Sequence, residues 1–352
     1  MKSWDVIIIG GGIIGLSLAI ALRKRGVQVL VVERGEPGHE SSHAAAGMLV
    51  NCPDETPAAL QALATASAER YPEFVHELQD ESGIHVDLRN HGTILLSSDE
   101  HAHASAGPLP SLLCELEPVL QASGYTAKFL EERSVDPRAL AAAALKAAKH
   151  RAVDIASGST VTAVLLSNGR AYGVATQKTQ YAADVVVNCA GAWAGQFPPY
   201  PFPARPVKGQ MLAVVGQRVL QHVVRSPAVY LVPRSDGRVL IGATVEEAGY
   251  DKRTDPDTIQ GLHQAAIRLI PALGEARVLE AWAGLRPGTP DGMPILGETS
   301  TPGYFVATGH FRDGILLAPM TAEVMSQVIT GAKPDIDIAR FSPARFELKA
   351  AS

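Results

Sequence analysis

The sequence has few cysteines, no basic run and no long apolar segment free of glycine. Its three cysteines, Cys52, Cys114 and Cys189, lie far apart and in no metal-ligand spacing, so we expect neither a disulfide framework nor a metal site. The formal net charge of −5 comes from 31 Lys and Arg against 36 Asp and Glu, a balance that argues against a nucleic-acid partner. Reduced thiols are typical of the cytoplasm, where we expect this protein.

One apolar stretch, from Trp4 to Leu22, resembles a signal peptide or a membrane span at first sight. Three consecutive glycines interrupt it, Asp5 stands at its front, and no small-residue cleavage site follows it. No other stretch is long enough to span a bilayer. With 352 residues, 46% of them hydrophobic and 19% charged, we expect a globular protein of one large or two interlocked domains.

The N-terminal residues predict a βαβ unit. The apolar run Val6–Ile9 is typical of a buried parallel strand, Ile13–Arg25 of a helix that Gly26 ends, and Val27–Glu33 of a second strand. Between the first strand and the helix stands the fingerprint Gly10-x-Gly12-x-x-Gly15.

This fingerprint is the signature of a dinucleotide site. Gly10 permits a tight turn, Gly12 lets the backbone approach a pyrophosphate at the helix N-terminus, and Gly15 lets helix and strand pack closely. Glu33, eighteen residues after Gly15, is placed to accept a hydrogen bond from a ribose hydroxyl. The alternative, a glycine-rich turn without a ligand, does not account for the strand, helix, strand and acid together.

The rest of the chain predicts an α/β fold with a Rossmann-type parallel sheet and an inserted antiparallel sheet. We expect helices over 58–82, 137–150 after the N-cap Asp136, and 314–330. We expect strands over 86–88 and 93–97 around the turn 90–92, then over 184–188, 211–215, 229–232, 238–244 and 304–307. A nucleotide domain of residues 1–82, 135–204 and 288–345 would surround a substrate domain of 83–134 and 205–287, with a tail over 346–352. The proline-rich residues 198–206 would cross between them.

Three further segments suggest chemistry. Ser41–Met48 is almost free of bulky side chains and would clear space for a flat cofactor, although a mobile loop has the same composition. Thr308–Leu316 is a second glycine-rich turn whose helix N-terminus would face an anionic group, or else a helix cap with an exposed Arg312. Arg286 has no acid in the four preceding positions, so it would bind an external carboxylate or pair with a distant acid.

Five segments carry a resemblance to a known family. VIIIGGGIIGLSLAIAL, HAAAGML, VYLVPRSDGRVLIGAT, WAGLRPGTPDG and TGHFRDGILLAP occur in the order and spacing of bacterial glycine oxidases, within the D-amino-acid oxidase and sarcosine oxidase group. The resemblance runs from about Asp5 to Thr330 and implies bound FAD. Sarcosine-type relatives attach FAD through a cysteine near the position of Arg286. No cysteine follows Cys189 here, so we expect non-covalent FAD.

The resemblance also implies site residues. Arg286 would clamp the substrate carboxylate, Tyr230 would donate a hydrogen bond to it, and Arg312 would lie beside substrate and flavin. Beyond the fingerprint glycines, the residues expected to line FAD are Ile13, Ile14, Glu33, Arg34, Ser41, Ser42, Ala46, Gly47, Met48, Val161, His310, Phe311, Arg312, Asp313, Gly314, Ile315 and Leu316.

The implied reaction is the oxidation of glycine and small D- or N-methyl amino acids. A hydride would pass from the substrate Cα to flavin N5, the imine would hydrolyse, and O₂ would reoxidise the flavin to give H₂O₂. The family setting is synthesis of the thiazole of thiamine. Many relatives carry a histidine two residues before the pocket tyrosine, where this sequence has Ala228, so the preferred substrate stays open, as does the role of loop 51–57.

Two other functions remain open at this point. One is a D-amino-acid dehydrogenase that passes electrons to a quinone or carrier protein, and the other is a flavin-binding subunit of a hetero-oligomeric oxidase. An NADPH-dependent monooxygenase is disfavoured because no second GxGxxG is present. Apart from the small amino-acid substrate and O₂, the partner we expect is a second copy of the chain, in a homo-oligomer.

Overall fold

The predicted βαβ unit lies at the centre of the first of two large sheets. It comprises β1 (Trp4–Ile9), α1 (Ile13–Lys24) and β2 (Val29–Val32). The structure, a computed structural model, describes residues 4–98, 115–121, 124–199, 202–217 and 220–347. Cys114, residues 200–201 of the proline-rich segment and residues 348–352 of the expected tail lie outside these ranges.

The first sheet has eight strands. Its main path runs β17-β18-β11-β1-β2-β8, with all neighbours parallel except the edge strand β17. Apolar residues on both faces of a strand are typical of such buried parallel sheets, and residues 6–9 and 29–32 are buried throughout. A hairpin of β9 and β10 pairs with β11 outside the main path. The bounds are β8 (Asp154–Ala156), β9 (Val161–Ser167), β10 (Arg170–Thr176), β11 (Gln180–Asn188), β17 (Ile295–Glu298) and β18 (Tyr304–Thr308).

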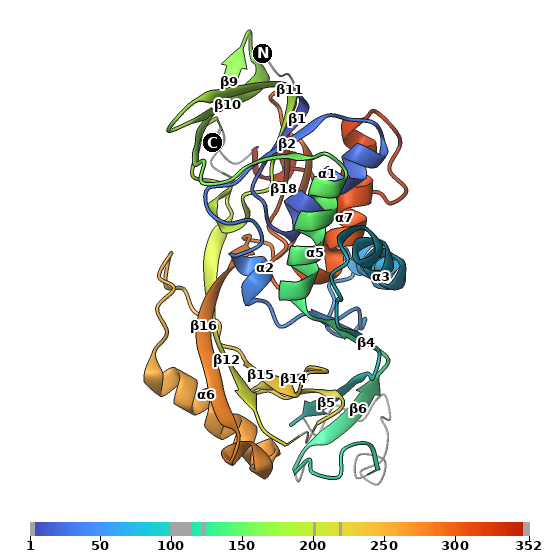
Figure 1. The fold of residues 1–352 in the computed structure, drawn as a ribbon, viewed down its shortest axis with the longest axis vertical. Coiled ribbons are helices and arrows are strands. Elements are labelled where there is room, and N and C mark those ends of the chain that lie inside the picture. Colours follow the sequence, from blue (N-terminus) through green and yellow to red (C-terminus); the bar gives the residue numbers. More distant parts are fainter. Residues whose placement is uncertain (1–3, 99–114, 122–123, 200–201, 218–219, 348–352) are drawn as a thin grey trace.

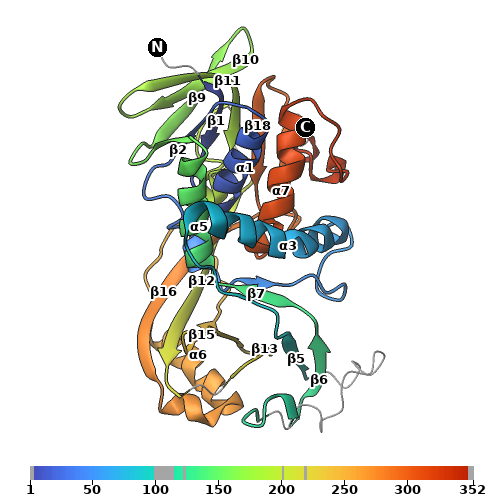
Figure 2. The ribbon, with the colours of Figure 1, turned by 45° about the vertical axis from the view of Figure 1, so that its right-hand side comes forward.

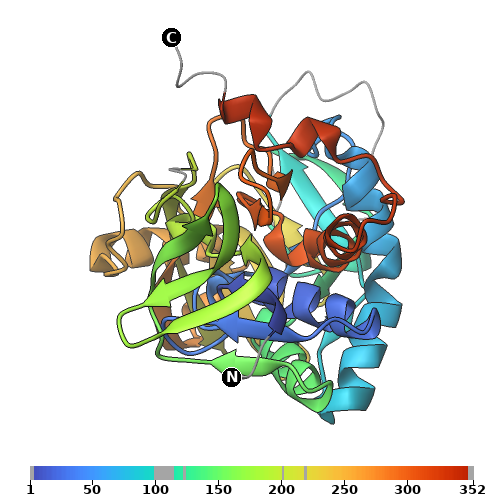
Figure 3. The same cartoon turned by 90° about the horizontal axis from the view of Figure 1, so that it is seen from above.

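Four helices lie on one side of this sheet, where α1 and α7 contact its strands, and the hairpin β9–β10 lies on the other side (Figures 2 and 3). Besides α1 they are α3 (Gln61–Ser82), α5 (Pro137–His150) and α7 (Gly314–Ile329). The predicted N-cap is confirmed, because the carboxylate of Asp136 accepts the N–H groups of Arg138 and Ala139. Across the described residues, no helix combines the length and the apolar composition needed to cross a bilayer.

The second sheet has seven strands and lies below the first in Figure 1. Its order is β16-β12-β15-β14-β13-β5-β6, antiparallel except for the parallel pair β13–β5. One face packs on helix α6 (Pro256–Leu269) through residues such as Leu212, Leu231 and Ile241. The bounds are β5 (Thr93–Ser97), β6 (Thr126–Leu130), β12 (Arg205–Val215), β13 (Val223–Arg225), β14 (Tyr230–Pro233), β15 (Arg238–Gly242) and β16 (Arg277–Gly288). The strands predicted over 229–232 and 238–244 are confirmed as the hairpin β14–β15, which turns at Ser235–Gly237.

A small third sheet corrects one prediction. The strands expected on either side of the turn 90–92 do not pair with each other. Instead β4 (Leu88–Arg89) joins β7 (Arg133–Val135), which also pairs with β3 (Met48–Leu49), whereas β5 belongs to the second sheet. Residues 90–92 therefore connect two sheets.

The short segments complete the chain. Helix α2 (Ser41–Ala44) occupies the first half of the small-residue segment Ser41–Met48, and α8 (Ala344–Glu347) follows near the C-terminus. Short 3₁₀ turns span Gly191–Trp193, Pro271–Gly274 and Ala339–Phe341.

Candidate active site

A cavity of about 1260 Å³ lies between the two large sheets. It exceeds the roughly 300–1,000 Å³ of a typical small-ligand pocket, so it has room for a dinucleotide together with a small substrate. All of the predicted site residues line it except Gly15 and Leu316: Gly10, Gly12, Ile13, Ile14, Glu33, Arg34, Ser41, Ser42, Ala46, Gly47, Met48, Val161, Tyr230, Arg286, His310, Phe311, Arg312, Asp313, Gly314 and Ile315.

The fingerprint glycines are required by close packing. A Cβ on Gly10 would lie 2.5 Å from the carbonyl oxygen of Cys189, and one on Gly15 would overlap the carbonyl oxygen of Gly10. Gly15 thus serves helix–strand packing beneath the cavity, while Leu316 is buried in the core on α7. The N-cap of α1, Gly12, offers no side-chain cap, and the first turn carries no acid. The helix N-terminus therefore suits an anion such as a pyrophosphate.

Glu33 is buried at the end of β2 and braces the glycine-rich loop. Its two carboxylate oxygens accept the backbone N–H groups of Gly11, at 2.7 Å, and Gly35, at 2.8 Å. Because Glu33 also lines the cavity, the same side chain can reach a ribose while it fixes the loop. The ribose contact itself stays a prediction.

The small-residue segment after Glu33 forms the wall between the two sheets. The Ser42 hydroxyl accepts the N–H of Ile13 at 2.9 Å, and the Ser41 hydroxyl donates to the carbonyl of Leu285 on β16. Gly47 has φ +75°, and a Cβ there would overlap the carbonyl oxygen of Val135. The segment is thus held in place from both sides, as a flat cofactor alongside it would require.

The second sheet presents its other face to the cavity. A row of directly opposed residues crosses it, from Arg225 through Tyr230, Gly242 and Met211 to Trp282. Opposed residues project from the same face of a sheet, so the Tyr230 ring stands beside a position without a side chain. A Cβ on Gly242 would lie 2.7 Å from the Tyr230 hydroxyl oxygen, which shows that the ring leans across this glycine.

Arg286 leans toward the same region from the other edge of the sheet. It stands on β16, and its guanidinium lies over Gly209 of the neighbouring strand β12, where a Cβ would overlap it. Nη1 donates to the carbonyls of Thr244, at 3.1 Å, and Lys208, at 3.4 Å. Within the described residues Arg286 forms no ion pair, so its charge is available for an external carboxylate.

Tyr230 and the two arginines interact electrostatically. Burial raises the pKa of the Tyr230 hydroxyl, and the guanidinium groups of Arg286 and Arg312 only partly oppose that rise. The hydroxyl therefore stays protonated and can donate a hydrogen bond. In this structure it lies 3.4 Å from the Met211 sulfur, a weak acceptor that a carboxylate would replace.

The turn before α7 supplies the remaining predicted residues. Burial lowers the pKa of His310 to about 3, so its imidazole is neutral and shares a hydrogen bond with the Thr321 hydroxyl at 3.1 Å. Burial also raises the pKa of Asp313 to about 6, with Arg312 opposing the shift. Asp313 stands at the N-cap of α7 without capping it by its side chain, and the first turn carries no acid. This second helix N-terminus also suits an electron-rich group.

One cluster in the cavity wall was not predicted. The buried guanidinium of Arg225 pairs with Glu132 and with Glu55, each at 2.8 Å. Burial raises the pKa of Glu132, and the Arg225 charge opposes that rise. Arg225 and Glu55 line the cavity beyond Tyr230 together with Ala228, so the end of the cavity is polar. Because the three residues lie far apart in the chain, no local pattern could have revealed the cluster.

Comparisons with known proteins agree with this geometry. The family model for FAD dependent oxidoreductases matches residues 5–328. The chain is 35% identical to the bifunctional protein ThiO/ThiG of Trichormus variabilis, over 99% of this chain and 56% of that protein. It is 34% identical to a glycine oxidase of Pseudomonas putida, over 97% of this chain and 98% of that protein. The chain thus spans about half the length of the bifunctional relatives.

A solved structure matches equally well. The crystal structure of glycine oxidase from Geobacillus kaustophilus superposes with a TM-score of 0.93 at 31% identity, covering 98% of this chain and 99% of that chain. The expected α/β fold with a parallel Rossmann-type core is therefore confirmed.

Proposed function

The chain belongs to the FAD-dependent oxidoreductase family, and on this premise we propose that it oxidises glycine and other small amino acids. The proposal rests on the surroundings of Arg286. Its guanidinium stands in the cavity wall, pairs with backbone carbonyls, and forms no ion pair within the described residues. A charge kept in this way suits a ligand with a carboxylate, which its planar fork can bind through two parallel hydrogen bonds.

The remaining roles follow from position. Arg286 on β16 and the Tyr230 hydroxyl on β14 would hold the substrate carboxylate, while Arg312 would lie beside the substrate. The fingerprint loop, the Ser41–Met48 wall and the turn before α7 would hold FAD without a covalent link. FAD, when bound, supplies the oxidant that accepts a hydride from the substrate Cα. The protein's part is then to orient a neutral amine and exclude water.

We further propose O₂ as the acceptor, with the imine released to water and H₂O₂ as the second product. The match to proteins named glycine oxidase supports an oxidase over a dehydrogenase. Synthesis of the thiamine thiazole is the proposed setting, supported by the match to the relatives named ThiO/ThiG.

The test is peroxide release by the purified holoenzyme with glycine, sarcosine, D-alanine, D-proline and L-amino acids. We expect peroxide with glycine and the small D- or N-methyl substrates, together with anaerobic bleaching of the flavin. Bleaching without peroxide in air would indicate a dehydrogenase. No bleaching with any of these substrates would leave the chain as a subunit that needs a partner, and would contradict the proposal.

A further inference from the structure

The two backbone carbonyls that orient the Arg286 guanidinium lie at an irregularity in the strand pairing of the second sheet. Strand β12 pairs Met211 with Gly242 of β15, and further along it pairs Lys208 with Glu246 in an isolated bridge. Between these two pairs, β12 advances by three residues while the opposite segment advances by four. The opposite segment therefore has one extra residue, which forms a β-bulge. Bulges re-aim the groups that they contain, and this one contains Thr244.

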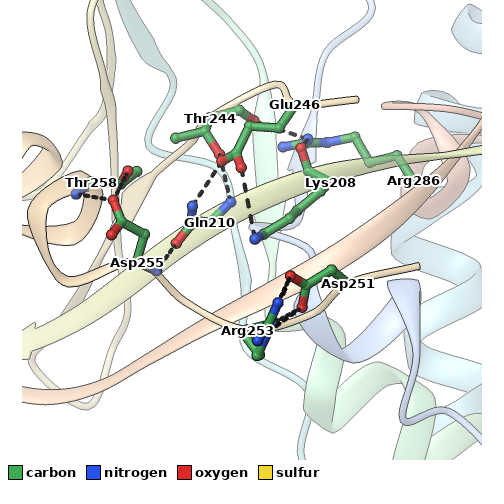
Figure 4. Close-up of polar contacts among 9 residues, drawn as sticks. All are labelled: Lys208, Gln210, Thr244, Glu246, Asp251, Arg253, Asp255, Thr258 and Arg286. Atoms are coloured by element: carbon green, nitrogen blue, oxygen red, sulfur yellow. Dashed lines mark hydrogen bonds and ion pairs between the residues drawn. The ribbon is translucent and has the colours of Figure 1, made fainter. Parts of the chain in front are cut away.

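The bulge frees one backbone carbonyl for Arg286. In a regular ladder the N–H of Gln210 would bond to a carbonyl of the opposite strand. Here it donates to the Thr244 hydroxyl at 2.9 Å instead. The Thr244 carbonyl is left to accept Nη1 of Arg286, next to the carbonyl of Lys208 (Figure 4). The side chain of Thr244 thus makes the backbone contact of Arg286 possible.

Glu246 holds this arrangement together. One of its carboxylate oxygens accepts the Thr244 hydroxyl and the Gln210 side-chain amide, the latter at 2.8 Å. The other lies 3.7 Å from the Lys208 ammonium, which is buried (Figure 4). Burial tends to raise the pKa of Glu246, but the hydrogen bonds from Thr244 and Gln210 and the Lys208 charge lower it on balance. The carboxylate is therefore ionised and occupied by three donors.

The network also reaches the helix that backs the sheet. The side-chain oxygen of Gln210 accepts the N–H of Asp255 at 2.7 Å, and the Asp255 carboxylate caps α6 by accepting the N–H of Thr258 at 3.0 Å (Figure 4). The acid nearest to the Arg286 contacts is thus anchored to the scaffold, so it does not neutralise the arginine.

We propose that Glu246 is a positioning residue for Arg286: it fixes the Thr244 bulge and the Lys208 backbone, and so keeps the guanidinium aimed and unneutralised for a substrate carboxylate. The inference rests on the proposed function, since it assumes that Arg286 binds a carboxylate. It assigns Glu246 no contact with the substrate.

The test measures the affinity of the holoenzyme for glycolate, a non-oxidisable carboxylate, from the change in flavin absorbance. Glu246→Ala should weaken glycolate binding by about 10- to 150-fold, as when a hydrogen bond of a charged group is lost. The KM for glycine should rise by a similar factor, more than kcat falls. Glu246→Gln should recover part, because its oxygen still accepts the Thr244 hydroxyl.

The matched control is Glu247→Ala, which removes the same charge one residue away. Glu247 is exposed and pairs with Arg205 at 3.1 Å, so glycolate affinity should not change. If Glu246→Ala does not fold, Thr244→Val carries the test, since it removes the hydroxyl that links Glu246 to Gln210. It should weaken glycolate binding in the same direction.

The outcomes separate the two proposals. If Arg286→Ala weakens glycolate binding and neither Glu246→Ala nor Thr244→Val does, the positioning role is overturned and the proposed function stands. An equal loss of glycolate affinity in Glu246→Ala and Glu247→Ala would show that the effect comes from the change in net charge. That result would also overturn the positioning role of Glu246. If Arg286→Ala itself leaves glycolate affinity unchanged, the proposed function fails first.

Discussion

Two glycines on neighbouring strands let Arg286 and Tyr230 approach one another. Gly209 on β12 leaves the space that the guanidinium fills, and Gly242 on β15 leaves the space under the Tyr230 ring. The sequence shows both glycines, but nothing in it shows that they lie on one face of the sheet as diagonal neighbours. Only the register supplies that information, because Gly242 pairs with Met211, two residues from Gly209 on β12.

Gly209→Ala should therefore act on substrate binding and not on the cofactor. The added methyl would force the Arg286 guanidinium to move, because a Cβ at this position overlaps its terminal atoms. Overpacking of this kind costs about 1–3 kcal/mol, so kcat/KM for glycine should fall by roughly 5- to 150-fold. Steady-state kinetics measure this, with FAD content as the second reading.

Gly261→Ala is the matched control for that experiment. Gly261 lies within α6, and a Cβ there would meet no atom within 4 Å. Alanine favours helices over glycine, so the control should keep its activity and gain slight stability. Equal activity in Gly209→Ala and Gly261→Ala would show that the guanidinium does not depend on the open position.

His310 should make stability depend on pH in acid. Burial holds its pKa at about 3 in the folded protein against 6.5 in the unfolded chain, so between these values only the unfolded chain binds the proton. The free energy of unfolding should then decrease as pH falls below 6.5, by at most about 1.4 kcal/mol per pH unit. Above pH 6.5 the residue should contribute no pH dependence.

His310→Gln removes this proton uptake. Urea unfolding of both proteins at pH 7.5, 6.0 and 5.0, at equal saturating FAD, should show the variant losing less stability in acid than the wild type. Parallel loss in the two proteins would mean that His310 titrates normally.

Among the helices and strands, the parallel core of the first sheet was predictable from the sequence. The pairing of edge strands such as β16 was not. Runs such as Val6–Ile9 are apolar on both faces, which specifies a buried parallel strand without further information. Strand β16 has no comparable signal, because most of its first half is exposed. Helix α6 was not predicted, although Asp255 followed by Pro256 gives it the same N-terminal signal as α5.

The glycine-rich loop and Glu33 act as one element. Both carboxylate oxygens hold loop N–H groups, so Glu33→Ala should leave the buried N–H of Gly11 and the more exposed N–H of Gly35 without their partner and loosen the loop. We expect FAD affinity to fall by about 1–3 kcal/mol, the cost of unpaired buried polar groups. Fluorescence titration of the apoprotein with FAD measures this. An unchanged dissociation constant would show that the brace plays no part in cofactor binding.

At the scale of the whole molecule, the cavity wall joins the two large sheets. The indole N–H of Trp282 on β16 donates to the Ala44 carbonyl at 3.1 Å, and Arg138 on α5 pairs with Glu280 at 2.6 Å. A Cβ on Gly284 would overlap the side chain of Ala44, so β16 of the second sheet and helix α2 approach closely here. The predicted domain limits and the homo-oligomer stay predictions.

Because FAD would contact residues of both large sheets, its removal should lower the free energy of unfolding of the whole molecule. A ligand at 100 times its dissociation constant stabilises a folded protein by about 2.7 kcal/mol. The holoenzyme should thus unfold at higher urea concentration than the apoprotein, by a margin that grows with added FAD. Equal midpoints at all FAD concentrations would contradict a cofactor held between the sheets.

The central claim is that Arg286 selects substrates by their carboxylate, and comparing glycine with methylamine in the wild type and Arg286→Ala tests it most directly. Removing one member of a buried charge pair costs about 3–5 kcal/mol, so kcat/KM for glycine should fall by roughly two to four powers of ten. Arg286→Lys should recover only part, because an ammonium cannot form the fork. Methylamine should be a poor substrate for the wild type and little affected by the substitution, with FAD content preserved. If Arg286→Ala slows both amines alike, or loses its flavin, Arg286 is structural and the claim is contradicted.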